Sequence, residues 1–282
     1  MFGSHLSIAG GLHKALLEAE RLGLETTQVF TKNQQQWKAP PLADATVAEW
    51  KAHCSRLGYC NTVSHDSYLI NLASPDDVLW KKSAALFEEE LRRCAALGIP
   101  YLVTHPGAHM GEGEEKGLAR IIAALDLLFE HVPCDGVTVC LEATAGQGTS
   151  LGHRLEHLAT ILDGVRRPER LGVCLDTAHL FAAGYDFRGR RFAKFMKELG
   201  ATVGAKRVKV LHLNDSKKAL GSRVDRHEHI GRGTIGLDGF KPFVREKAFA
   251  KVPKILETPK GKDEQGRDWD AVNVEVLRGM ER

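Results

Sequence analysis

Short apolar runs alternate with longer amphipathic stretches along the whole chain. Eight of the apolar runs are rich in Val, Ile, Leu and Thr and predict strands, because such residues suit extended backbone. These strands begin near Phe2, Thr27, Asn61, Tyr101, Thr138, Leu171, Val208 and Pro253. Eight strands that alternate with helix-sized segments predict an α/β fold, a closed (β/α)₈ barrel that occupies residues 1–282 as one domain.

The amphipathic stretches carry recognisable helix ends. From Gly11 to Leu22, apolar residues repeat at helical spacing and predict one buried helix face. Ser74 and Pro75 predict the start of another helix, with Ser74 as the N-cap and Pro75 at the first helical position. This helix is expected to end at Gly98, because glycine tolerates the left-handed conformation that often follows a helix.

Two segments are longer and less regular than ordinary connections. Thr31–Pro41, after the second strand, mixes basic, amide and aromatic groups. Leu213–Asp238, after the seventh strand, holds five Lys or Arg residues among small and polar ones. Long irregular connections in compact domains are usually functional, so we expect both segments to be functional loops at the ends of strands.

Composition and charge set broad limits on function. The chain is 43% hydrophobic and 27% charged, which excludes a disordered or collagen-like chain. Its formal charge of +3 permits a polyanionic partner without requiring one. The six cysteines lack paired spacing and predict reduced thiols, and neither a signal peptide nor an apolar run of membrane-spanning length is recognisable. We therefore expect a cytoplasmic protein without a membrane partner.

Six consecutive strands end on a residue that can bind a metal ion. These residues are His65, His105, Glu142, Asp176, His212 and Glu257, and His179 follows three residues after Asp176. The carboxyl ends of barrel strands converge on one face, where barrel active sites lie. Imidazole and carboxylate groups suit zinc and related divalent ions, and carboxylates crowded together without metal would repel one another. The pattern therefore favours a metal centre over six unrelated strand caps.

The long loop after the seventh strand adds two more candidate ligands. Asp225 and His227 are one residue apart, so in extended backbone both side chains point the same way and could complete a further site with His179. By contrast, Gly231–Gly236 matches G-x-G-x-x-G without following an apolar strand, which makes it a poor dinucleotide fingerprint. His153 and His157 are interpreted as surface or satisfied histidines, and the chain has no nucleophile elbow or P-loop.

The sequence resembles the endonuclease IV family of apurinic/apyrimidinic (AP) DNA endonucleases. The resemblance extends from the second strand to the eighth. The matching runs are Phe30–Asn33, His65–Leu72, His105–Gly107, Thr144–Gly148, Gly172–Thr177, His212–Asp215, Gly221–His227 and Leu256–Thr258.

The resemblance implies a TIM barrel that holds three zinc ions, with Mn²⁺ as an alternative at one site. It assigns His65 and His105 to the first ion, Asp176, His212 and Glu257 to the second, with Glu142 bridging the two, and His179, Asp225 and His227 to the third. Glu142 and Glu257 are then catalytic residues as well as ligands. Family members act in DNA repair, where they hydrolyse the phosphodiester 5′ to an abasic site and leave a 3′-hydroxyl, and we also expect trimming of 3′-blocking groups.

The resemblance also implies how damaged DNA is recognised. Tyr68 and Leu69 match the family's wedging position, and Gln35 stands where many members carry Arg. Lys32, Arg226 and Arg232 are expected to contact phosphates. Ala143 replaces the Asn that usually follows the bridging glutamate. The expected partner is double-stranded DNA with abasic sites, bound by a cytoplasmic, nucleoid-associated monomer with no protein partner.

Two alternatives remain open. A metal-dependent sugar isomerase or epimerase on the same barrel also places Glu, Asp, His and Glu at strand ends, but such enzymes generally use fewer histidines and one or two metals. A non-catalytic binder of damaged DNA or metal would require an incomplete ligand set, and all nine candidate ligands are present. The number of bound metal ions distinguishes the first alternative, and turnover on abasic DNA distinguishes the second.

Overall fold

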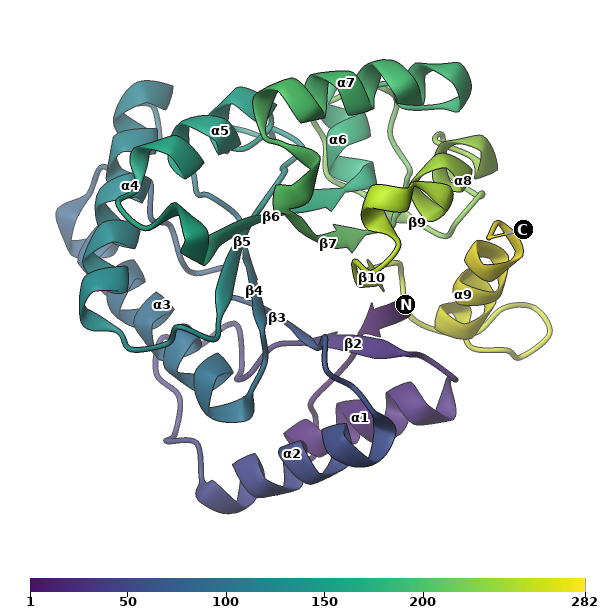
Figure 1. Cartoon of the computed structure of the whole chain (residues 1–282), viewed down its shortest axis with the longest axis horizontal. Helices are drawn as coiled ribbons and strands as arrows, with labels where there is room; N and C mark the ends of the chain where they lie inside the picture. Colours follow the sequence, from purple (N-terminus) through teal and green to yellow (C-terminus); the bar gives the residue numbers. More distant parts are fainter. Residues whose placement is uncertain (282) are drawn as a thin grey trace.

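The alternating runs fold into parallel strands that close on themselves, with helices outside (Figure 1). The computed structural model describes residues 1–281. Within these residues the barrel order is β1-β10-β7-β6-β5-β4-β3-β2, which confirms the predicted fold. The strands are β1 (Phe2–His5), β2 (Thr26–Val29), β3 (Val63–His65), β4 (Tyr101–Thr104), β5 (Thr138–Glu142), β6 (Leu171–Asp176), β7 (Val208–His212) and β10 (Lys254–Leu256).

The helices surround this barrel as an outer layer (Figure 1). They are α1 (Leu12–Arg21), α2 (Asp44–Leu57), α3 (Asp77–Leu97), α4 (Glu114–His131), α5 (Leu155–Gly164), α6 (Thr177–Ala183), α7 (Phe192–Thr202), α8 (Leu237–Arg245) and α9 (Trp269–Gly279). Within residues 1–281, no helix is both long enough and apolar enough to cross a membrane.

The start of α3 differs from the prediction. Asp76, not Ser74, is the N-cap, and its carboxylate accepts a hydrogen bond from the Leu79 amide at 2.7 Å. Ser74 instead accepts from the Asp76 amide through its hydroxyl at 3.2 Å, which places it in the turn before the helix. Both side chains can cap a helix, so sequence alone did not decide between them. The predicted end is confirmed, since Gly98 has a φ of 73°.

Apolar side chains fill the inside of the barrel. This inner cluster consists of Val63, Val103, Cys140, Cys174, Val210 and Ile255, all of them buried. The packed interior gives the barrel a rigid floor beneath the carboxyl ends of its strands. The ends of β6, β7 and β10 lie side by side, because Asp176 of β6 pairs with His212 of β7, and His212 pairs with Ile255 of β10. Polar residues that end these strands therefore meet at one mouth of the barrel.

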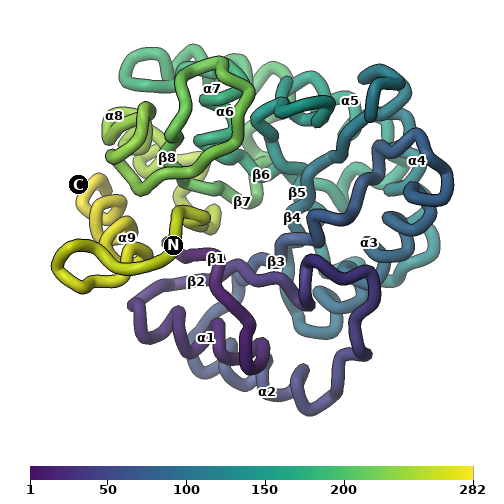
Figure 2. The backbone as a smooth tube through the Cα atoms, turned by 180° about the vertical axis from the view of Figure 1, so that it is seen from behind, coloured from purple at the N-terminus to yellow at the C-terminus, as the bar shows by residue number. Residues whose placement is uncertain are grey.

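The long segment after β7 contains a small hairpin that the sequence did not reveal. Strand β8 (Asp215–Ser216) pairs antiparallel with β9 (His227–Glu228). Figure 2 shows the backbone from behind, with this segment in light green beside α6 and α7. The pairing of β9 with β8, which follows β7 closely, brings Asp225 and His227 back to the barrel mouth.

Candidate metal centre

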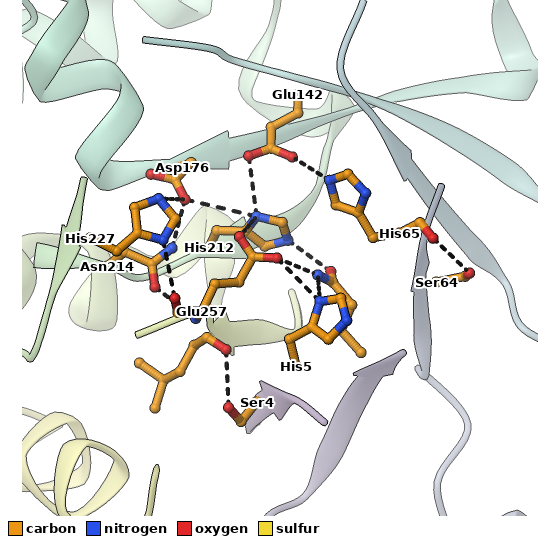
Figure 3. Close-up of polar contacts among 12 residues, drawn as sticks. Ser4, His5, Ser64, His65, Glu142, Asp176, His212, Asn214, His227 and Glu257 are labelled. Carbon is orange, nitrogen blue, oxygen red and sulfur yellow. Dashed lines mark hydrogen bonds and ion pairs between the residues drawn. The ribbon is translucent and has the colours of Figure 1, made fainter. Parts of the chain in front are cut away.

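The buried Glu142 carboxylate lies at the centre of a cluster of histidines at the barrel mouth. Its Oε1 lies 3.0 Å from Nδ1 of His179 and 3.3 Å from Nδ1 of His212. Its Oε2 lies 3.3 Å from Nε2 of His65 and 3.5 Å from Nε2 of His105. One carboxylate therefore touches rings that come from four different strand ends or the residues after them. Figure 3 shows two of these contacts, those of Glu142 with His65 and His212.

The structure brings all nine predicted ligand residues into this cluster. Within each of three groups, the candidate ligand atoms lie within 4.8 Å of one another. The groups are His65, His105 and Glu142; Glu142, Asp176, His212 and Glu257; and Asp176, His179 and His227. Asp225 adjoins the third group, because its carboxylate oxygens lie 3.1 Å from Nε2 of His179 and 3.2 Å from Nε2 of His227. Asp176 belongs to two groups, whereas the resemblance implied only one.

Four of the histidines have one ring nitrogen hydrogen-bonded to a carbonyl oxygen of the backbone or of Gln28, although Nδ1 of His179 also lies 3.0 Å from Glu142. The bonds run from His65 Nδ1 to the Asp66 carbonyl (2.9 Å), His179 Nδ1 to the Ala143 carbonyl (3.0 Å), His212 Nε2 to Gln28 Oε1 (2.8 Å) and His227 Nδ1 to the Glu257 carbonyl (3.1 Å). An acceptor at one nitrogen fixes the proton there and leaves a lone pair on the other. This is the support that metal-binding histidines usually receive.

The carboxylates are oriented by two amide side chains to which the sequence analysis assigned no role. Asn214 donates to Oδ2 of Asp176 at 2.6 Å and accepts from the Glu257 amide at 2.7 Å. Gln28 donates to Oε1 of Glu257 at 2.6 Å. A signal was present for Gln28, because a polar side chain inside a fully buried strand must find a partner.

Burial and charge act in opposite directions on the titration of this cluster. Burial opposes ionisation of Glu142, but the His212 and His105 rings outweigh it and hold the pKa of Glu142 well below its usual range. Burial also opposes protonation of His65 and His227, but carboxylates, chiefly Glu142 for His65 and Asp176 for His227, raise both pKa values to about 9. In the absence of metal, these rings therefore hold protons that a bound cation would replace.

The donor set fits metal ions better than it fits an ordinary hydrogen-bond network. In the described part of the chain, Oε2 of Glu142 and Nε2 of His227 are buried and have no hydrogen-bond partner of good geometry. Buried polar atoms rarely remain without a partner unless an ion or water supplies one. Imidazole nitrogens and carboxylate oxygens are ligands typical of zinc. The cluster can therefore hold metal ions.

A second histidine cluster, outside the barrel mouth, does not fit a metal. Glu114, His153 and His157 also bring their polar atoms close together. However, Nδ1 of His157 accepts from the Gly152 amide at 3.2 Å, so its proton is on Nε2, which donates to Glu114 at 3.1 Å. No lone pair then remains on His157 for a metal. Both histidines are hydrogen-bonded as predicted, although they are buried rather than on the surface.

The predicted wedge residues lie beside the cluster on the loop after β3. The side chain of Tyr68 is 61% exposed, and its ring centroid lies 5.4 Å from that of His65. Leu69 is half-buried next to it, and Gln35 is exposed on the neighbouring loop. Arg226 is exposed directly after Asp225, and exposed Arg232 lies over the Trp269 ring at 4.5 Å.

The structure does not place Lys32 on an exposed rim, where the predicted contact with DNA phosphates would require it. The Lys32 side chain is 2% exposed, and its Nζ lies 3.0 Å from Oε1 of Glu90 on α3. The other oxygen of Glu90 accepts from the Thr31 hydroxyl at 2.8 Å. A buried ammonium that is already paired would have to give up its carboxylate partner to bind a phosphate. Lys32 instead anchors the loop that carries Gln35.

The glycine-rich run after β9 wraps around an internal carboxylate. Asp215 accepts hydrogen bonds from the amides of Gly231 (2.9 Å), Gly233 (3.0 Å) and Ile235 (3.0 Å). A side chain at Gly233 would place its Cβ 2.4 Å from Oδ1 of Asp215, so glycine is required there. The amides that could hold a phosphate are thus occupied by Asp215, consistent with rejecting a dinucleotide site.

Two hollows adjoin the cluster. One of about 230 Å³ is lined by His105, Gln147, His179, Asp225 and Arg226, among others. The second, of about 590 Å³, lies between the loops after β1 and β2, and its lining includes His5, Ser7, Phe30, Asn33, Gln35 and Lys260. Both open at the barrel mouth beside the candidate ligands, where a substrate can reach them.

Comparison with known proteins shows the family and the fold to which the chain is similar. The model of the xylose isomerase-like TIM barrel family matches residues 16–279. The chain is 49% identical over 280 residues to a Chloroflexus aurantiacus protein named probable endonuclease 4, covering 99% of this chain and 97% of that protein. The crystal structure of endonuclease IV from Thermus thermophilus matches with a TM-score of 0.85 and 37% identity, over 99% of this chain and 98% of that one. A D-tagatose 3-epimerase-like protein matches with a TM-score of 0.74 but only 18% identity, over 99% of this chain and 96% of that one, which shows a shared fold alone.

Proposed function

The chain belongs to the endonuclease IV family, and from this premise we propose that it is a zinc-dependent DNA repair nuclease that hydrolyses the phosphodiester 5′ to an abasic site. The observation that carries the proposal is the cluster around Glu142, in which histidines and carboxylates of nine residues present three overlapping groups of ligand atoms. A single-metal barrel enzyme has no need of the group formed by His65 and His105.

Three zinc ions match these three groups, with Mn²⁺ as an alternative at one of them. His65 and His105 would hold the first ion, Asp176, His212 and Glu257 the second, and His179, Asp225 and His227 the third. Glu142 would bridge the first two, because each of its oxygens faces a different pair of rings. Bound divalent cations lower the pKa of water to supply a nucleophile near neutral pH, and they offset charge on the phosphate.

The chain's own residues hold the reacting groups in place and supply no nucleophile. The Cys174 thiol lies beside Glu142 and His212, but burial raises its pKa to about 12, so it remains protonated. Water therefore attacks phosphorus, the bond to the 3′ oxygen of the preceding nucleotide breaks, and that oxygen leaves as a 3′-hydroxyl. Glu142 and Glu257 keep their orientation, the latter through Gln28. The same bond joins a 3′-blocking phosphate group to the strand, so we expect it to be cleaved as well.

Recognition of the abasic site is proposed for the exposed loop residues around the mouth. An abasic nucleotide lacks its stacked base, so it leaves the helix at lower cost than a normal nucleotide. Tyr68 is largely exposed and adjacent to His65, which suits insertion into the gap, with Leu69 beside it. Gln35 offers a neutral amide to the opposite strand, and Arg226 and Arg232 offer charge to phosphates.

The test is cleavage of an end-labelled duplex that carries one tetrahydrofuran abasic analogue, by protein whose metal content has been measured. The analogue resists β-elimination, so a lyase cannot nick it. We expect about three zinc ions per chain and one product that ends in a 3′-hydroxyl. No cleavage by fully metal-loaded protein would refute the proposal, and turnover of an aldose or ketose with one or two metals would replace it by a sugar isomerase.

A further inference from the structure

His5 ends β1 beside the metal-ligand cluster without belonging to any of its three groups. Its Nδ1 lies 2.9 Å from Nε2 of Gln28 and 3.4 Å from Oε1 of Glu257. Its other nitrogen, Nε2, is buried and has no hydrogen-bond partner among residues 1–281 (Figure 3). The proposed cleavage chemistry does not involve this ring.

The hydrogen-bond network determines which nitrogen of His5 carries the proton. The Gln28 carbonyl oxygen accepts from Nε2 of His212 at 2.8 Å, so the Gln28 amide nitrogen faces Glu257 and His5. That nitrogen has two hydrogens and cannot accept a hydrogen bond, so at 2.9 Å it must donate to Nδ1 of His5. Nδ1 is therefore unprotonated, and the ring's only proton is on Nε2. His5 presents an N–H donor that has no acceptor.

The surroundings of His5 indicate where its acceptor comes from. The ring borders the hollow of about 590 Å³ between the loops after β1 and β2. Two ammonium groups also border it, but Lys260 is paired with Asp270 at 2.8 Å and Lys32 with Glu90 at 3.0 Å. The side chain of His5 is 15% exposed although Nε2 is covered, so a contact between Nε2 and a group in the hollow requires a shift of the ring.

We propose that His5 is a substrate-contacting residue, whose Nε2–H donates to an oxygen of the DNA sugar-phosphate backbone seated in this hollow. This inference rests on the proposed nuclease function. A buried donor without a partner is costly in the free protein, and an oxygen acceptor from the substrate removes that cost when DNA binds. The contact lies next to Glu257, so it fixes the strand close to the bond that is cleaved.

Two substitutions separate a substrate contact from an internal role. In His5→Asn, the amide oxygen replaces Nδ1 as the acceptor for Gln28, but the donor toward the hollow is lost. In His5→Gln, the longer amide places a donor near the position of Nε2 but does not replace Nδ1. We expect kcat/KM on the tetrahydrofuran duplex to fall about 10- to 100-fold in His5→Asn and about threefold or less in His5→Gln, at equal zinc content. His131→Asn, on the exposed end of α4, is the matched control and should equal the wild type.

Altered substrates identify the oxygen. A natural abasic site has a sugar hydroxyl that the tetrahydrofuran analogue lacks, and a methylphosphonate replaces one charged phosphate oxygen. If the penalty of His5→Asn disappears on a duplex with a methylphosphonate next to the abasic site, the acceptor is a phosphate oxygen. If the penalty appears only with the natural site, the acceptor is the sugar hydroxyl.

Other outcomes overturn the inference. Wild-type cleavage rates in both His5 variants, on the natural abasic duplex as well as on the tetrahydrofuran duplex, would show that Nε2 contacts no substrate. A loss of zinc that parallels the loss of activity, or a greater loss in His5→Gln than in His5→Asn, would show that His5 only supports Gln28 and Glu257. Absence of cleavage by the metal-loaded wild type would instead refute the proposed function, and this inference with it.

Discussion

Replacing Lys32 by Met removes one charge from a buried ion pair while leaving the volume of the side chain nearly unchanged. Both side chains of the pair, Lys32 and Glu90, are 2% exposed, with 3.0 Å between Nζ and Oε1. Removing one partner of such a pair leaves the other charge buried and uncompensated, which typically costs about 3–5 kcal/mol. With an unfolding entropy of about 2.1 cal/mol/K per residue, a chain of this length should lose about 5–8 °C in Tm.

The assay pairs calorimetry of the zinc-loaded protein with DNA affinity measured at several salt concentrations. A lysine that touches a phosphate contributes about one unit to the salt dependence of binding, whereas a buried structural lysine contributes none. We therefore expect Lys32→Met to lower Tm without changing the salt slope. Arg232→Ala is the matched comparison and should lower the slope by about one unit with little change in Tm. An unchanged Tm together with a reduced slope in Lys32→Met would show that Lys32 reaches the DNA after all.

Four further changes test other parts of the site. Glu142→Gln should abolish cleavage and reduce zinc content while the barrel remains folded by circular dichroism; near-normal turnover would contradict its bridging role. Tyr68→Ala should reduce the preference for abasic over intact duplex at full zinc content, and unchanged discrimination in a binding titration would remove Tyr68 from recognition. Asp215→Asn should loosen the loop that carries Arg232, because Asp215 accepts hydrogen bonds from the Gly231 and Gly233 amides. DNA binding should then weaken as much as in Arg232→Ala. Equal rates of proteolysis of that loop in variant and wild type would contradict the loosening. Chelator-treated protein should lose stability as the pH rises from 6.5, the ordinary pKa of histidine, to about 9. The reason is that protonated His65 and His227 stabilise the fold only below their raised pKa values. A free energy of unfolding in urea that increases over this pH interval would contradict the raised pKa values.

The sequence predicted the barrel because each strand is a short apolar run with a clear boundary. The observed strands begin within two residues of the expected positions, for example at Thr26 instead of Thr27 and at Val63 instead of Asn61. The polar residues at strand ends were visible for the same reason, since an apolar run that stops at His65 or Glu142 marks where the strand leaves the core. Local pattern was sufficient for these features.

Features that depend on distant partners were not accessible in this way. Lys32 resembles a surface lysine until Glu90 on α3 is placed beside it. Gln28 is significant only because the fold brings it between Glu257 and His212, which are more than 180 residues away in sequence. The same holds for the hairpin of β8 and β9, whose two strands are short and separated by a ten-residue connection, Lys217–Arg226. Each of these contacts arises from tertiary packing and leaves no periodic signal in the chain.

The site combines a rigid inner layer with an exposed rim, and this division predicts which substitutions act independently. Five of the nine inner ligands are buried, namely His65, Glu142, Asp176, His179 and His212. The orientation of several ligands is fixed by Gln28, Asn214 and backbone carbonyls, so changes on the rim should leave metal loading intact. Arg226 is the exception, because it directly follows Asp225 and donates through Nη1 to the Asp225 carbonyl at 2.6 Å. A change at Arg226 therefore disturbs the backbone of a candidate ligand as well as a phosphate contact. Effects at Tyr68 and Arg232 should add, as is usual for separated sites, whereas Arg226 and Asp225 should couple.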